Sequence, residues 1–184
     1  MPLSATSWGA TTGEADREYR CDRILPAAPG RWLRAIDVAA APSTVFRRVA
    51  QLRAAPYSYD WLDNFGRRSP RELLPWCWDL AEGQSVMTIF TLESFEPDRE
   101  LTVLMKPGRA TTIFGSLALT YRVEPVGAVG PDEAGASRLL AVMRVCDAPG
   151  PLGGARRSLL AWGDLLMMRK QLVTLAGLAA ADAG

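Results

Sequence analysis

Histidine is absent from this chain of 184 residues, and that absence excludes more chemistry than any other feature of the composition. Without an imidazole there is no Ser-His-Asp or Cys-His nucleophile system, no HExxH zinc site and no histidine-ligated haem. Any proton transfer that the protein catalyses must use Tyr, Asp, Glu, Lys, Arg or ordered water. No GxGxxG follows a predicted strand and no GxxxxGK[ST] is present, so we expect no nucleotide cofactor.

Cysteine is scarce, and its three positions, Cys21, Cys77 and Cys146, lie far apart without a CxxC pair. This pattern argues against a disulfide framework and against a thiolate metal site, and predicts buried or incidental thiols. The acidic run Asp60-x-x-Asp63-Asn64 offers a hard cation too few oxygen ligands. We therefore expect no metal.

The chain also lacks a charge bias and a long apolar run. Twenty-one Lys and Arg balance 20 Asp and Glu, and the net charge of +1 gives no electrostatic reason to expect nucleic acid or an anionic membrane as partner. No apolar run approaches the ~18 residues of a membrane span. The first fifteen residues lack the basic and apolar order of a secretory signal, so a cytoplasmic protein is expected. We expect it to be a monomer or a homodimer.

The densest group of polar aromatic residues lies between Tyr57 and Asn64. Tyr57, Tyr59 and Trp61 stand there beside two carboxylates and an amide. A buried Tyr hydroxyl or indole N–H needs a hydrogen-bond partner, whereas the wall of a ligand cavity uses apolar bodies and polar tips together. We predict that this stretch lines a ligand pocket, with simple packing as the alternative.

Hydrophobic periodicity divides the rest of the chain into strands and helices. Alternation predicts strands over 31–39, 86–95, 101–106, 112–124 and 138–146, with a turn at 96–99 and an exposed loop at 127–135. A period of three to four predicts helices from about 42 to before Pro56, over about 57–64 and over about 155–180. Residues 1 to about 20 show no periodicity and are expected to form a flexible arm before a single domain over 21–184.

The last predicted helix carries the largest set of apolar residues. Leu165, Met168, Leu172 and Leu175 form one stripe, and Leu159, Trp162, Leu166 and Val173 are expected to widen it. A half-buried antiparallel sheet needs its apolar face covered, and one long amphipathic helix can cover it. The predicted fold class is therefore α+β.

Three stretches of the chain, 34–42, 51–64 and 162–172, resemble a bacterial subgroup of the START-like, or SRPBCC, superfamily, which includes polyketide cyclases and lipid-transfer domains. The resemblance spans roughly Cys21 to Ala180. It implies a helix-grip fold, in which a curved antiparallel sheet grips the long C-terminal helix around a hydrophobic cavity, with two short helices after the first strand. One departure is the pair Trp76 and Trp78, where smaller or more polar residues are expected; if they face the cavity, they shape its ligand.

Four residues are candidates for chemistry in such a cavity. Asp60 is the first candidate for a general base with a raised pKa, or else accepts a structural hydrogen bond, while Asp63 is expected to cap a helix. Tyr121 lies on the apolar face of its predicted strand, and is either a proton donor toward a substrate carbonyl or a core Tyr with a bonded hydroxyl. Asp164 lies on the edge of the helical stripe, pairs with an Arg, or faces the cavity.

Two functions of different classes follow from these residues. One is a cofactor-free polyketide-type cyclase or dehydratase; the other is a carrier or sensor of an apolar metabolite or lipid. In both, the partner is a hydrophobic small molecule, and the flexible methionines suit an irregular ligand, although they also suit a core. The residues expected to contact it are Tyr57, Tyr59, Trp61, Trp76, Trp78, Met105, Met143, Asp164, Met167 and Met168.

Overall fold

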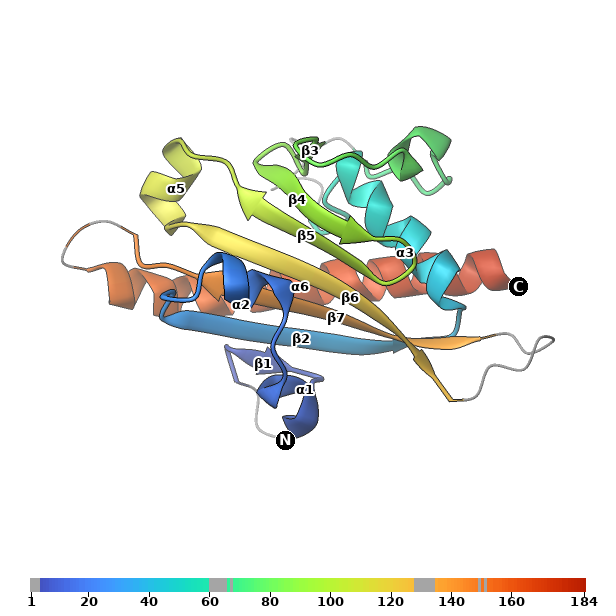
Figure 1. The fold of residues 1–184 in the computed structure, drawn as a ribbon, viewed down its shortest axis with the longest axis horizontal. Coiled ribbons are helices and arrows are strands. Elements are labelled where there is room, and N and C mark those ends of the chain that lie inside the picture. The colour runs from blue at the N-terminus through green and yellow to red at the C-terminus, as the bar shows by residue number, and fades with distance from the viewer. Residues whose placement is uncertain (1–3, 60–65, 67, 128–134, 149, 151) are drawn as a thin grey trace.

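A seven-stranded sheet forms the centre of the protein, with the strand order β1-β2-β7-β6-β5-β4-β3 (Figure 1). The computed structural model describes residues 4–59, 66, 68–127, 135–148, 150 and 152–184. Only β1 pairs parallel with its neighbour; the other pairs are antiparallel. In chain order the elements are β1 (Ser7–Trp8), α1 (Thr12–Asp16), α2 (Arg20–Ile24), β2 (Gly30–Val38), α3 (Pro42–Ala50), η1 (Gln51–Arg53), η2 (Pro75–Trp78), β3 (Ser85–Val86), β4 (Phe90–Glu96), β5 (Glu100–Met105), α5 (Arg109–Phe114), β6 (Leu117–Val126), β7 (Ala136–Val145) and α6 (Gly153–Ala183).

Helix α6 covers one face of the sheet and forms the main core with it. Its buried side carries Ala161, Leu165, Met168, Leu172, Leu175 and Ala179, at the spacing of a helical stripe. Opposite them, alternate residues of the central strands point into the same core, among them Leu119, Leu139 and Met143. The sheet and the long helix thus bury their apolar faces against each other.

The second apolar stripe of α6 faces outward, and the expectation that it widens the buried stripe is wrong. Leu159 is 75% exposed, Trp162 52%, Leu166 59% and Val173 46%. One face of a helix is enough to cover the sheet, so residues some 100° or more away from the middle of that face remain in solvent.

Helix α3 packs against the C-terminal half of α6. Pro42 occupies the first turn, where its missing N–H is no loss, and Val45, Phe46 and Val49 are buried. The Arg48 guanidinium donates to both carboxylate oxygens of Asp182, at 2.6 Å and 2.5 Å. This bidentate pair fixes the end of α6 to α3.

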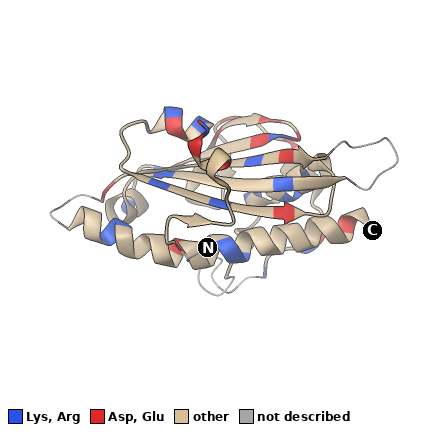
Figure 2. Cartoon of the chain, turned by 90° about the horizontal axis from the view of Figure 1, so that it is seen from below, with Lys and Arg blue, Asp and Glu red and all other residues tan. Residues whose placement is uncertain are grey.

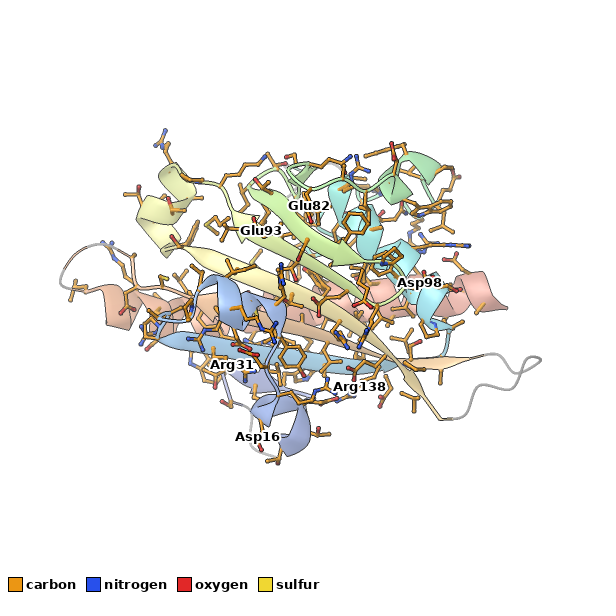
Figure 3. The ribbon with its side chains drawn as sticks, in the orientation of Figure 1. Asp16, Arg31, Glu82, Glu93, Asp98 and Arg138 are labelled. Carbon is orange, nitrogen blue, oxygen red and sulfur yellow. The ribbon has the colours of Figure 1, made fainter. Side chains whose placement is uncertain are left out.

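The N-terminal residues cover the opposite face of the sheet, so residues 4–20 are not the predicted flexible arm. Tyr19 and Cys21 are buried in a second core with Leu33 and Val142. Long-range polar contacts add to this packing: Arg138 binds Glu14 at 2.7 Å, and Figure 3 shows Arg31 and Arg138 where the N-terminal elements meet the sheet. These contacts join positions more than 100 residues apart, which periodicity alone does not reveal.

Three predicted elements differ from the structure. The strand expected over 86–95 is split into β3 and β4, because Met87 and Thr88 adopt positive φ between them. The strand expected from residue 112 begins only at Leu117, after α5, and Ile113 is exposed. The helix expected from residue 57 does not begin there, because Tyr57 has a φ of 54° in a bend; residues 60–65 lie outside the described residues.

Candidate functional site

Arg34 is the most unusual residue of the core, because it is a charged side chain with no exposed surface. It shares the α6-facing side of β2 with Trp32, Ile36 and Val38. The cross-strand row places Arg34 opposite Ala141 of β7, and Ala141 opposite Tyr121 of β6. A methyl group between two long side chains leaves both of them room to turn toward α6.

The guanidinium of Arg34 meets one carboxylate and two backbone carbonyls. Its Nη2 lies 3.2 Å from Asp164 Oδ2 and donates to the Ala5 carbonyl at 2.7 Å, and Nη1 donates to the Leu33 carbonyl at 3.1 Å. The Nε–H finds no acceptor among the described residues. One hydrogen-bond donor of a buried cation thus has no protein acceptor there.

Asp164 lies largely between α6 and the sheet, and its side chain is 20% exposed; this partial burial favours the neutral form of its carboxyl. Desolvation raises the pKa of this carboxyl from 3.8 to about 7, against the opposing effect of Arg34. The same desolvation lowers the pKa of Arg34, which remains charged. The pair therefore contains a carboxyl that can exchange a proton near neutral pH.

Tyr121 lies behind this pair, fully buried, and its hydroxyl has a partner. It donates to Gln171 Oε1 at 2.5 Å, while Gln171 Nε2 donates to the Pro56 carbonyl at 2.6 Å. Burial raises the pKa of Tyr121, so the hydroxyl stays protonated. Of the two sequence-based interpretations, this geometry fits the core Tyr with a bonded hydroxyl; its proton is directed at Gln171.

A hollow of about 490 Å³ lies on α6 next to the Arg34–Asp164 pair. Its described lining is apolar apart from one guanidinium and consists of Leu159, Leu160, Trp162, Gly163, Leu165, Leu166 and Arg169. Gly163 and Leu165 are the chain neighbours of Asp164. Arg169 stacks over the Trp8 ring at 5.6 Å and forms no ion pair with a described residue. A smaller hollow of about 230 Å³, lined by Thr111, Ser116 and Asp147 among others, lies at the end of β6.

The predicted aromatic residues that the structure describes do not gather around one space. Tyr57 is buried in the main core and Tyr59 is half-buried, whereas Asp60, Trp61 and Asp63 lie outside the described residues. Trp76 is 52% exposed and stacks with Arg53, and Trp78 is 38% exposed and stacks with Arg47. The two tryptophans of η2 thus lie at the surface, so the idea that they face an internal cavity is not what the structure shows.

The predicted methionines divide between core and surface. Met105, Met143 and Met168 belong to the main core, while Met167 is half-buried and its carbonyl accepts a hydrogen bond from Ser58. Met87, which the sequence did not single out, lies 3.6 Å from Gln171 Nε2 through its sulfur. Arg34 and Gln171 were also missed; for Arg34 the signal was present, since it alternates with Trp32 and Ile36 on the apolar face.

Neither a metal cluster nor a membrane-crossing helix is found in the part of the chain that the structure describes. No three Asp, Glu, Cys or His side chains there gather as metal ligands, and no helix there is long and apolar enough to span a bilayer. Cys21 and Cys77 are buried and Cys146 is half-buried, and none of the three is in a disulfide.

The order of the elements decides the architecture. One strand is followed by helices and then by antiparallel strands, and a long terminal helix lies across the sheet. The chain has the helix-grip fold. The prediction of an α+β helix-grip architecture is therefore confirmed.

Comparisons with known proteins add solved structures of similar shape. No protein-family model matches the sequence, and no curated protein matches it. Protein CV1439 of Chromobacterium violaceum is 17% identical, with a TM-score of 0.49 over 83% of this chain and 98% of the other. XoxI of Bacillus cereus is 14% identical, with a TM-score of 0.46 over 80% and 93%. A point mutant of norcoclaurine synthase from Thalictrum is 12% identical, with a TM-score of 0.42 over 84% and 96%.

Proposed function

We propose that this helix-grip protein binds a hydrophobic small molecule with an acidic or carbonyl group, and carries or senses it. The observation that supports this most directly is the hollow on α6. Its volume of about 490 Å³ lies in the range of small-molecule sites, roughly 300–1,000 Å³, and such sites combine apolar walls with few polar groups.

Arg169 supplies the polar group of the proposed site. It is the only charged residue among the described residues of the lining, and its stacking on Trp8 holds the guanidinium in one orientation. A guanidinium recognises planar oxygen pairs of a carboxylate, or a carbonyl oxygen, through directed N–H donors. The ligand is therefore an amphiphile, with its apolar body against Leu159, Trp162 and Leu166.

The second candidate function is the cofactor-free cyclase or dehydratase, and Asp164 is the observation that favours it. General acid–base catalysis works best when the pKa of the group lies near the working pH, and burial raises the pKa of Asp164 to about 7. Its chain neighbours Gly163 and Leu165 line the hollow, while its own carboxyl faces Arg34. In this function Asp164 moves the proton, beside Asp60, which is proposed as a base from the sequence; the Tyr121 hydroxyl already donates to Gln171 Oε1.

Ligand binding can be tested with two fluorescent probes, anionic anilinonaphthalene sulfonate and uncharged Nile red. We expect about one site per chain for both. Trp162→Ala removes an apolar wall and should weaken both probes by about 1–3 kcal/mol. Arg169→Gln should weaken the anionic probe alone, and Arg20→Gln, an exposed control on the opposite face of the sheet, should weaken neither. Equal affinities for all four proteins would contradict the assignment.

The catalytic alternative needs a different readout. A synthetic poly-β-keto thioester incubated with the protein should lose one water, detected by mass spectrometry, and Asp164→Asn should slow this loss at least tenfold. Native mass spectrometry of the freshly purified protein should identify any bound metabolite. A metabolite bound tightly and left unchanged would favour the carrier over the cyclase.

A further inference from the structure

The outward side of α6 carries apolar residues that no described element covers. Leu159, Trp162, Leu166 and Val173 follow each other at spacings of three, four and seven residues and remain 46% to 75% exposed. At about 100° per residue they lie within an arc of about 60° on the helix. We call these four residues the outer stripe.

Basic residues flank the outer stripe on both sides. Lys170 and Arg156 lie on one side of it and Arg169 on the other, by the same helical geometry. Arg156 and Lys170 form no ion pair with a described residue. Between Gly153 and Ala181 the only acidic residue is Asp164, which points inward to Arg34. Figure 2 shows Lys and Arg along the middle and the N-terminal part of α6, and acidic colour at its C-terminal end.

The nearly balanced charge of the whole chain conceals this local excess. The net charge of +1 gave no reason to expect an anionic surface as partner, because it averages over both faces of the sheet. Electrostatic attraction to a surface depends on the charges within about a Debye length, roughly 8 Å in physiological salt. Among the described residues of α6, the charged side chains that flank the outer stripe are cations.

We propose that the outer stripe and its flanking cations dock the protein onto the surface of an anionic lipid bilayer. An apolar helix face with Trp and Leu, bordered by Lys and Arg, lies in the interface of a membrane with its apolar side among the acyl chains. Trp prefers that depth, and a lysine stem reaches past the stripe to the head groups. The helix lies on the membrane in this arrangement and does not cross it.

A second copy of the chain fits this surface less well. Two antiparallel α6 helices would bring Arg169 and Lys170 of each copy close to those of the other, and like charges repel. The four side chains expose on the order of 400 Å² of apolar surface, whereas a stable protein interface buries about 800 Å² on each side. A bilayer makes no such demand on shape or area.

Vesicle co-sedimentation of the full chain tests the proposal. We expect binding to vesicles that mix phosphatidylcholine with phosphatidylglycerol, little binding to pure phosphatidylcholine, and weaker binding at high salt. Lys170→Glu should reduce the affinity for anionic vesicles at least about fivefold, while Arg20→Glu, with the same charge change on the opposite face of the sheet, should not. Val173→Ser should reduce it a few-fold, and Val126→Ser is the control, because the two valines are 46% and 48% exposed.

Four results would overturn the proposal, and the first three concern vesicles, variants and oligomeric state. Those three are equal binding to both kinds of vesicle or to neither, equal losses in Lys170→Glu and Arg20→Glu, or a dimer in solution that Val173→Ser separates into monomers. Capture of a soluble acidic protein by the stripe, without vesicle binding, would also overturn it. Lys170 and Val173 do not line the described hollow, so both variants should keep their affinity for the fluorescent probes. Vesicle docking and small-molecule binding can therefore fail separately.

Discussion

Replacing Asp164 by Leu should destabilise the protein more than replacing Arg34 by Met, although both variants break the same ion pair. A guanidinium stays protonated at any pH that the protein meets. Asp164→Leu therefore leaves a cation with no exposed surface and without its counter-charge. A carboxyl, by contrast, can take up a proton and become neutral when its partner is removed.

The magnitudes follow from the partners of each group. Removing one member of a buried ion pair typically costs about 3–5 kcal/mol, and Asp164→Leu should approach that loss only above about pH 7, where Asp164 is ionised in the wild type. Arg34→Met removes two hydrogen bonds to the carbonyls of Ala5 and Leu33, each worth about 1 kcal/mol. Where Asp164 is protonated, the loss should stay near about 2 kcal/mol.

The effect of pH has a definite sign. Asp164 has a pKa of about 7 in the folded protein, above its ordinary 3.8, so the folded state binds this proton more tightly than the unfolded state. The contribution of Asp164 to the free energy of unfolding is greatest at low pH. It falls as the pH rises from about 3.8 to about 7 and is constant at higher pH. Without Arg34 the pKa rises further, and the fall continues above pH 7 by up to about 1.4 kcal/mol per pH unit.

Urea unfolding of the wild type, the two single variants and the double variant measures these differences in the free energy of unfolding. They appear as shifts of the urea midpoint, provided that the slope of free energy against urea concentration stays constant. The Arg34→Met/Asp164→Leu protein should be more stable than Asp164→Leu and no less stable than Arg34→Met, because no buried charge is left. The reasoning is refuted if Arg34→Met is as unstable as Asp164→Leu at every pH. It is also refuted if the losses of the single variants simply add in the double variant.

Three further outcomes are expected. Tyr121→Phe leaves Gln171 Oε1 without its buried donor and should lower the free energy of unfolding by about 1–3 kcal/mol in urea, whereas an unchanged midpoint would show that the bond is not formed. Gly9→Ala should destabilise the protein, because a Cβ at φ +69° would lie 2.1 Å from the Ala35 carbonyl oxygen. Gly13→Ala is the control, since a Cβ there meets nothing within 4 Å. Equal melting temperatures of the two variants would mean that the N-terminal segment is not docked. Treatment with a chelator should leave the melting temperature unchanged, and a stoichiometric metal in the washed protein would contradict this.

The sequence predicted the elements whose pattern is long and regular. β7 and α6 were expected within about three residues of their observed bounds, because alternation and helical spacing persist there over many residues. The break at Met87 and Thr88 has no Gly or Pro to announce it, and Ile113 continued an alternation that α5 interrupts. Local patterns of this kind carry no information on which of two conformations the surroundings favour.

The candidate site was harder to predict for a different reason. The Arg34–Asp164 pair joins residues 130 positions apart, and only the register of the sheet and the rotation of α6 bring them together. A helix with two apolar stripes does not reveal in its sequence which stripe faces the sheet, and for that reason Trp162 was assigned to the core. The roles proposed for Asp60 and Trp61 remain predictions.

The short strand β1 also determines what the sheet offers to other chains. It pairs with β2 at Leu33 and Arg34 only, in the middle of a strand that otherwise forms the edge of the sheet. A chain shortened to begin after Trp8 would leave the outer edge of β2, the side away from β7, without a neighbouring strand, and such an edge invites a strand of another molecule. We therefore expect β1 to limit pairing with other chains at this edge, and a purification tag is better attached at the exposed C-terminus than in place of the N-terminal residues.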